Sequence, residues 1–300
     1  MNAVQLRLFP APKPLVERLG AEFFKRVPRQ PGVYLMSGEG ERLLYVGTAK
    51  NLRQRLTSYR SVQPERASRK VIRLVHQVRA ITWEVCRSPQ MAMLRENELL
   101  RLHKPKFNVL NTRPEHYVFV GFKVIDATLS LRLTKVPARQ EGEQLFGAFK
   151  GLGRIRAARV ALLRLLWCAD RQPASLYELP SALFQEKPPE LCHVALHRLD
   201  WSALPELMRN FLAGEDDGLL QFLSAGLLAR ETVPACFRPL HEQDTEALRM
   251  FFRFGPARNR ALRERCAFDR ELVAQSELDD LLVLAGRRTR EQSLDSIRTD

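Results

Sequence analysis

The chain has 300 residues, of which 45% are hydrophobic and 27% are charged, so it can bury a core and is not intrinsically disordered. Its 48 Lys and Arg residues outnumber 34 Asp and Glu residues, which gives a net charge of +14. No apolar run is long enough to span a membrane, and five scattered cysteines exclude a disulfide framework and a C-x-x-C zinc site. The N-terminus has no apolar segment of a secretion signal, so we expect a cytoplasmic protein.

The first part of the chain predicts a small β-β-α-α-β-α unit. An N-terminal arm is expected over residues 1–22, and a helix over 15–27. Ser88 is a suitable N-cap and Pro89 a suitable first residue for the last helix of the unit, which Pro105 follows. The expected elements are strands 32–36 and 43–47 around a turn at 37–40, helices 51–59 and 67–78, strand 80–86, and a helix from 88 to about 103.

The rest of the chain predicts two further regions. Over residues 116–172 we expect a β/α extension, with a hairpin of strands 117–125 and 129–136 and a helix over 153–168. Residues 173–300 are rich in Leu and interrupted by Pro, which predicts an α-helical C-terminal domain. His193 and His197 stand four residues apart, and we expect them on a half-exposed helical face rather than at a metal.

The positive charge is concentrated in one part of the sequence. Residues 1–120 have a net charge of +13, whereas residues 121–300 have a net charge of +1. A basic module attracts polyanions, and release of counterions makes such binding to nucleic acid strong and salt-dependent. A generally basic protein without such a partner is the alternative.

The helix that starts at Ser88 carries an acidic residue on its apolar side. On a helical wheel Glu96 lies at the centre of a face formed by Ala92, Met93, Leu99, Leu100 and His103. Glu98 is expected on the opposite, polar side, together with Asn97 and Arg101. A carboxylate on an apolar face is costly unless it is paired or binds a cation, so Glu96 is either a structural ion pair or a metal ligand.

An arginine and two tyrosines are further candidates. Arg55 lies one helical turn from Leu52 and Tyr59, beside the stripe expected to face the core, where it could form a structural pair or clamp a phosphate. Tyr34 and Tyr45 fall on neighbouring expected strands and could share a face. Beside a metal or a guanidinium a phenol can become a base, whereas two strand tyrosines can also simply pack.

The order and spacing of these residues resemble the GIY-YIG endonuclease family. The stretch PGVYLM…LLYVGTAKNLRQRLTSY…ENELLRLHKPKFNVL is most similar to its UvrC/Cho excinuclease branch. The resemblance covers residues 28–112, with a looser likeness through HYVFVGFKV and LFGAFKGLGRIRAARVALLRLLWC. It implies an α/β (α+β) fold with a GIY-YIG nuclease domain over 23–115, in which helices flank a central antiparallel-type sheet.

The resemblance also implies roles for individual residues. Glu96 would hold one divalent ion, Mg²⁺ or Mn²⁺, and Arg55 would clamp the phosphate. Tyr34 and Tyr45 would orient or deprotonate the attacking water, with Tyr45 preferred as the base. Tyr59 and Asn108 would complete the catalytic set. The residues expected to contact DNA are Thr48, Lys50, Arg53, Arg55, Lys104 and Lys106.

One position departs from the resemblance, and other features are missing. Thr48 stands where UvrC-like proteins usually carry Lys, and Lys50 is a candidate substitute. The absence of an RNase H-like domain and of a helix-hairpin-helix pattern makes the chain more similar to Cho. That similarity implies a single incision 3′ to a lesion in nucleotide excision repair. The implied partners are damaged or branched DNA and UvrB, and the implied location is the bacterial cytoplasm, in association with the nucleoid. The alternative is a DNA-binding repair scaffold with a degenerate site.

A short motif in the N-terminal arm suggests a further partner. Gln5, Leu6, Leu8 and Phe9 lie in the sequence QLRLF, which resembles the peptide that binds the bacterial sliding clamp. Two leucines and an aromatic ring on an arm can fill an apolar pocket of a partner. The alternative is that these side chains pack as an edge strand.

Overall fold

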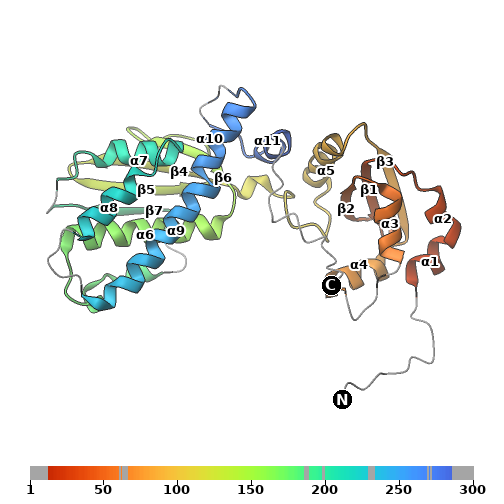
Figure 1. Cartoon of the computed structure of the whole chain (residues 1–300), viewed down its shortest axis with the longest axis horizontal. Coiled ribbons are helices and arrows are strands. Elements are labelled where there is room, and N and C mark those ends of the chain that lie inside the picture. Colours follow the sequence, from red (N-terminus) through yellow and green to blue (C-terminus); the bar gives the residue numbers. More distant parts are fainter. Residues whose placement is uncertain are drawn as a thin grey trace, which may run out of the picture. The chain divides into compact units, whose positions relative to one another are not determined.

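The computed structural model describes residues 13–285, apart from 61, 63–66, 186–188, 198–199, 229–233, 269 and 271. These residues divide into two compact units, each of which is described by itself (Figure 1). The first unit contains the described residues up to Arg113 together with 282–285, and the second contains 114–281. None of the described helices is both long and apolar enough to cross a membrane.

The first unit is built on a three-stranded antiparallel sheet with the order β2-β1-β3. Tyr34 on the central strand pairs with Gly47, and Met36 pairs with Tyr45, so the expected hairpin is confirmed. The strands are β1 (Gly32–Ser37), β2 (Leu43–Ala49) and β3 (Ala80–Val85).

Helices cover both faces of this sheet, as the sequence predicts (Figure 1). They are α1 (Pro14–Leu19), α2 (Ala21–Arg26), α3 (Leu52–Arg60), α4 (Arg69–Gln77) and α5 (Pro89–His103). One face packs its core against α1–α4, and the other packs Val33 and Val46 against Leu99 and Leu100 of α5. Because side chains alternate along a strand, neighbouring residues of β2 serve opposite faces.

The start of the first unit differs from the expected arm and single helix. Gly20 has φ +80°, a left-handed conformation that separates α1 from α2. Leu15 and Phe24 are both buried in the core, so residues 14–26 are part of the folded unit rather than of an arm ending at residue 22. The Pro and apolar pattern of this segment located the helical region but not the break.

The second unit contains a four-stranded antiparallel sheet with the order β6-β4-β5-β7. Its strands are β4 (Val118–Ile125), β5 (Thr128–Thr134), β6 (Gln144–Phe149) and β7 (Leu191–Ala195). The hairpin of β4 and β5 confirms the expected one, whereas β6 and β7 were not predicted. His193 lies on β7, not on a helix, and its Nδ1 is 2.9 Å from Ser130 Oγ on β5.

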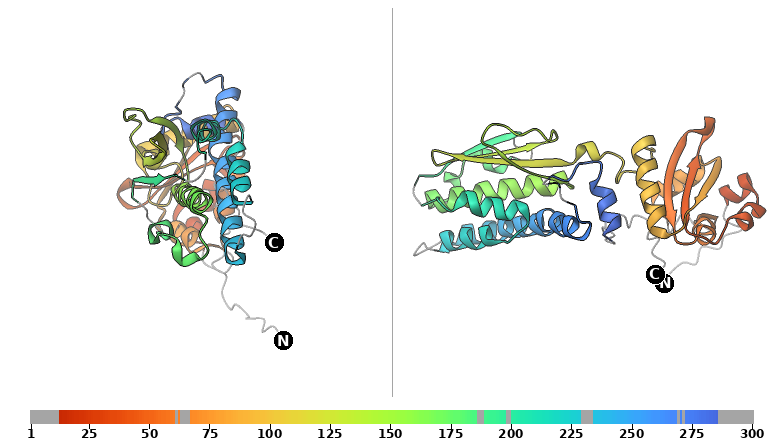
Figure 2. Two further views of the ribbon diagram at one scale, coloured as in Figure 1. Left: turned by 90° about the vertical axis from the view of Figure 1, so that its left-hand side faces the viewer. Right: turned by 90° about the horizontal axis from the view of Figure 1, so that it is seen from above.

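Helices follow the sheet strands in the second unit, as expected for the C-terminal region. The helices are α6 (Leu152–Arg171), α7 (Leu204–Ala213), α8 (Gly218–Leu228), α9 (Arg238–Phe254) and α10 (Pro256–Arg265), together with the first residues of α11 (Leu278–Leu284). In Figure 2, α6 and α9 lie on the same side of the sheet. A single apolar core joins β4, β5 and α6 to α7, α8 and α9, so residues on both sides of the expected boundary at 172 share one core.

Candidate active site around strand β2

Three side chains predicted for the site form a hydrogen-bonded cluster on the α3 face of the first sheet. Arg55 Nε donates to Tyr34 Oη at 3.2 Å, and Arg55 Nη2 donates to Tyr59 Oη at 3.3 Å. The two phenol oxygens are 3.1 Å apart. The guanidinium also lies 5.1 Å from the centre of the Tyr59 ring. One cation therefore binds two phenol oxygens, and would stabilise negative charge that develops beside them.

Tyr45 joins this cluster through its ring. Tyr34 and Tyr45 have ring centroids 6.0 Å apart and project from β1 and β2 on the same face of the sheet. Tyr34 is 0% exposed and Tyr59 3% exposed, whereas Tyr45 is 8% exposed. Of the three phenols, Tyr45 is thus the most accessible to water.

Gly47 provides the space that the Tyr34 ring occupies. A Cβ atom at this position would lie 2.5 Å from Tyr34 Oη and 2.6 Å from Tyr34 Cζ. Contacts that short do not occur, so any larger residue would displace the phenol. The glycine of the YVG sequence is therefore required by the position of Tyr34 and not by a turn.

Glu96 approaches the same strand from the other face. Thr48 Oγ1 donates to Glu96 Oε2 at 3.3 Å. Glu96 is half-buried, with Ala92, Leu99 and Leu100 buried beside it on α5. The expected apolar face is confirmed for these three residues, but not for His103, which is exposed.

Asn108 supports the strand from its free edge. Its Oδ1 accepts from Val46 N at 2.9 Å, and its Nδ2 donates to Val46 O at 2.8 Å. The side-chain amide thus replaces the backbone of a missing neighbouring strand. Three successive residues of β2 each contact a different group: Val46 binds Asn108, Gly47 accommodates Tyr34, and Thr48 binds Glu96.

Asn97 was expected on the polar side of α5, and that prediction is wrong. Asn97 is 1% exposed, and its Oδ1 accepts from Asn111 Nδ2 at 3.0 Å. Asn111 has φ +59° in the segment after α5, a conformation that Asn tolerates. This buried pair fixes the segment that carries Asn108 to the helix that carries Glu96.

The residues around Glu96 fit a divalent cation that keeps most of its water. Mg²⁺ binds oxygen ligands and is often held by only one or two carboxylates. Glu96 offers a half-buried carboxylate with a hydroxyl beside it. Within the described ranges no three His, Cys, Asp or Glu residues gather closely enough to enclose an ion. The site thus suits a hydrated ion rather than a protein-enclosed one.

The residues predicted to contact DNA have different surroundings. Lys50, Lys104 and Lys106 are exposed. Arg53 is half-buried and its Nε donates to Val27 O at 2.7 Å, so this side chain also ties α3 to the end of α2. The clamp-motif residues Gln5, Leu6, Leu8 and Phe9 lie outside the described residues.

Comparison with known proteins shows what this region is similar to. Residues 30–109 match the family model of the UvrC-like GIY-YIG domain. The chain is 35% identical over 163 residues to UvrABC system protein C of Protochlamydia amoebophila, which covers 51% of this chain and 26% of that protein. It is 31% identical over 203 residues to UvrABC system protein C of Escherichia coli K12, which covers 66% of this chain and 32% of that protein. The chain thus spans about a quarter to a third of these relatives.

A solved structure is similar to part of the chain. It is the GIY-YIG N-terminal endonuclease domain of UvrC from Thermotoga maritima, bound to its catalytic divalent cation, magnesium. The sequence identity is 32%, the match covers 29% of this chain and 93% of that chain, and the TM-score is 0.26.

Proposed function

We propose that this chain, whose residues 30–109 are a UvrC-like GIY-YIG domain, is a metal-dependent DNA endonuclease. It hydrolyses a phosphodiester of one strand, 3′ to a lesion, in nucleotide excision repair. The observation that carries the proposal is that Val46, Gly47 and Thr48 each support a different side chain of the predicted site.

Each residue of the cluster would have its own role in the cleavage of the phosphodiester. Arg55 presents a guanidinium that binds the two phenols and would clamp a phosphate of the DNA. Water attacks phosphorus, the new P–O bond forms as the bond to the leaving oxygen breaks, and the proton of the water passes to Tyr45 in its phenolate form. Tyr34 and Tyr59 fix the guanidinium and the Tyr45 ring in place.

Glu96 would hold one Mg²⁺ or Mn²⁺ ion, with Asn108 bracing the strand beside it. Such an ion supplies stabilisation of charge on the scissile phosphate and the leaving oxygen. Thr48 orients the carboxylate through its hydroxyl. Lys50, Arg53, Lys104 and Lys106 would contact the DNA backbone, together with Arg55 and Thr48.

A DNA-binding repair scaffold with a degenerate site is the second candidate, and Thr48 is the observation that favours it. A threonine provides no positive charge where similar proteins usually have Lys. Its hydroxyl also binds one oxygen of Glu96 that a cation would use.

Further partners follow from the same proposal. UvrB would load the chain at damaged DNA, and residues 5–9 would bind the sliding clamp. The protein would act in the bacterial cytoplasm, associated with the nucleoid. Deletion of residues 1–12 should abolish clamp affinity, and unchanged affinity would contradict this part of the proposal.

The nuclease is tested by nicking of a lesion-bearing duplex with Mg²⁺ or Mn²⁺, with and without UvrB. Glu96→Gln should lower the nicking rate at least about 100-fold while DNA binding survives. Glu98→Gln is the matched control, because this residue lies on the same helix, is 60% exposed and pairs with Arg95. The control should nick at the wild-type rate.

Two results would count against the nuclease. If Glu96→Gln nicks as fast as wild type, the metal site is misassigned. If wild-type protein binds all lesion-bearing, branched and flap duplexes tightly but cuts none of them with either metal, the scaffold is the better account.

A further inference from the structure

The second unit contains one strongly basic stretch that the even charge balance of this region conceals. Residues 249–270 include seven arginines and two acidic residues, which leaves the rest of residues 121–300 with a net charge of −4. Four phenylalanines lie in the same stretch. Basic side chains interleaved with aromatic ones are typical of surfaces that bind single-stranded nucleic acid.

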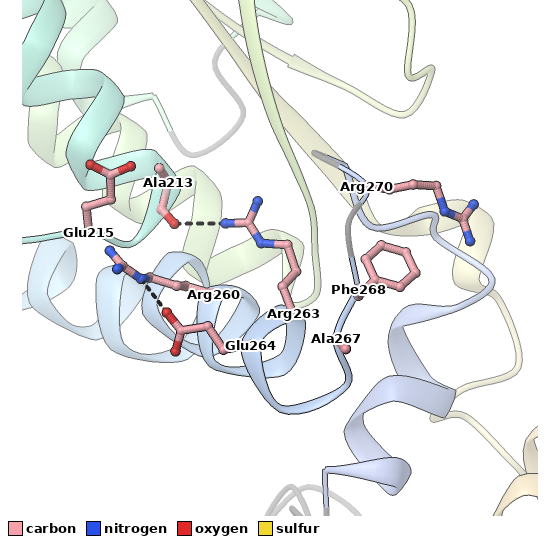
Figure 3. A pocket seen from close by; sticks show the side chains of 8 residues that line it. All are labelled: Ala213, Glu215, Arg260, Arg263, Glu264, Ala267, Phe268 and Arg270. Carbon is pink, nitrogen blue, oxygen red and sulfur yellow. Dashed lines mark hydrogen bonds and ion pairs between the residues drawn. The ribbon is translucent and has the colours of Figure 1, made fainter.

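A pocket of about 420 Å³ opens in this stretch (Figure 3). Its charged lining residues are Arg260, Arg263, Arg270, Glu215 and Glu264. As Figure 3 shows, the first two arginines project from α10, whereas the third belongs to the segment that follows it. The volume suits one nucleotide, since sites for small ligands begin at about 300 Å³.

The walls of the pocket are held by the fold. Asn259 on α10 is buried and its Nδ2 donates to Ala148 O on β6 at 2.8 Å. Gly214, at the end of α7, has φ +81°, and a Cβ there would lie 2.4 Å from Pro256 O. The start of α10 is thus packed directly against the end of α7, so the pocket is preformed.

The arginines of the pocket interact with groups that a bound phosphate can displace. Arg260 Nε donates to Glu264 Oε1 at 2.8 Å, and Arg270 Nη2 donates to Glu277 Oε1 at 2.5 Å. Both arginine side chains are more than 40% exposed, and exposed ion pairs contribute little to stability. Arg263 Nη2 donates to Ala213 O at 3.2 Å, a backbone acceptor that carries no charge.

An aromatic ring in the pocket points to the kind of anion. The Arg270 guanidinium lies 4.7 Å from the centre of the Phe268 ring, so the two groups form a stacked platform. Unpaired bases stack on aromatic rings and on guanidinium planes, whereas a base inside a duplex cannot. An acidic peptide would use the arginines but would gain little from the ring.

We propose that the pocket between α7 and α10 binds a nucleotide of single-stranded DNA, with its phosphate on Arg260, Arg263 and Arg270 and its base on Phe268. The choice of nucleic acid as ligand rests on the proposed function. The pocket would hold the unpaired strand next to a lesion, bubble or flap, and it takes no part in phosphodiester cleavage.

The test uses the full chain with Glu96→Gln and no divalent ion, so that binding is measured without cleavage. A single-stranded oligonucleotide containing 5-iodouracil is bound, irradiated and mapped, because this base crosslinks to aromatic side chains. We expect a crosslink on the peptide that contains Phe268, and at least a fivefold loss of it with Arg260→Ala/Arg270→Ala. These two arginines are exposed, so this variant should keep the wild-type thermal midpoint.

Salt dependence gives an independent readout. For the single strand, removing two phosphate contacts should reduce the slope of log affinity against log salt by about 1.4. Phe268→Ala should weaken single-strand binding about fivefold without changing that slope. Arg249→Ala is the matched control, because Arg249 is 57% exposed, pairs with Glu246 and does not line the pocket.

Three results would overturn the inference: no crosslink at Phe268, an unchanged salt slope in the double variant, or tighter binding of a hexaglutamate peptide than of the oligonucleotide. Each is independent of nicking. A chain that crosslinks at Phe268 but never nicks DNA would refute the proposed nuclease alone.

Discussion

The two units bury polar groups in different ways. In the first unit Arg55 donates to two phenols, and the groups around β2 come from α3, α5 and the segment after α5. In the second unit several buried charges form compact ion pairs: Arg132 with Glu143, Arg164 with Asp244, and Lys150 with Asp279.

This difference distinguishes a candidate functional site, around β2, from ion pairs that stabilise the fold of the second unit. A buried pair of opposite charges satisfies both partners and locks the elements that carry them. A guanidinium held by phenols is positioned to act on an anion that arrives later. We therefore expect substitutions in these buried ion pairs to change stability, and substitutions of the polar side chains around β2 to change catalysis.

The largest effect is expected for Asp244→Ala in the second unit. Asp244 is buried, and Arg164 of α6 donates to both of its oxygens, so the variant leaves a guanidinium without its carboxylate. Loss of one partner of a buried pair costs about 3–5 kcal/mol of unfolding free energy. Chemical denaturation measures it, with Glu246→Ala on the same helix as an exposed control. A loss below about 1 kcal/mol would show that the pair does not hold α6 to α9.

Arg55→Ala should come next, and it acts on the rate. Removing one preorganised donor from a developing oxyanion lowers turnover about 10²–10³-fold, which corresponds to about 2.7–4 kcal/mol. Single-turnover nicking with saturating enzyme measures this step. Arg55→Lys should rescue little, because an ammonium cannot donate to Tyr34, Tyr59 and a phosphate in the same planar arrangement. A wild-type nicking rate in Arg55→Lys would contradict this planar arrangement of donors.

Two glycines allow a matched comparison of the units. Gly47→Ala places a Cβ within 2.6 Å of Tyr34 Cζ, so we expect a loss of about 1–3 kcal/mol in stability together with slower nicking. Gly153→Ala in α6 meets no atom within 4 Å and should raise stability by about 0.5–1 kcal/mol. Thermal unfolding distinguishes the two variants. If both changed stability equally, the conclusion that Gly47 makes room for the Tyr34 ring would be wrong.

The smallest expected effect is on the pH dependence of the unfolding free energy. Burial acts to raise the pKa of Glu143, but Arg132 and the Gln140 N–H hold this pKa below its ordinary value of 4.5. A lowered folded-state pKa gives stability that is present above pH 4.5 and is lost as the pH falls through the folded pKa. The unfolding free energy should therefore decline below about pH 4.5, and less steeply in Glu143→Gln. Glu141→Gln, on the exposed surface, should keep the wild-type slope.

The sequence predicted the first unit well because its signals are local. The caps Ser88 and Pro89, the turn after β1 and the alternation in β1 and β2 each depend on neighbouring residues. The helix of Glu96 was located for the same reason. Asn97 was misplaced because its partner, Asn111, lies beyond the end of the helix, where a helical wheel cannot include it.

The second unit was harder because its organisation is long-range. β7 is only five residues long, and it pairs with β5 about 60 residues earlier. β6 contains no β-branched residue and includes Gly147, so its composition does not suggest a strand. The pocket at Arg260 was missed because net charge was summed over 180 residues, in which acidic helices cancelled the local excess.

The amide of Asn108 has a consequence beyond the site. β2 is an edge strand, and unpaired edges recruit strands of other molecules. Because Asn108 occupies both backbone groups of Val46, and Phe107 N binds Leu44 O, this edge is closed to such recruitment. Loss of Asn108 should therefore promote self-association as well as inactivity, so light scattering must accompany any assay of its variants.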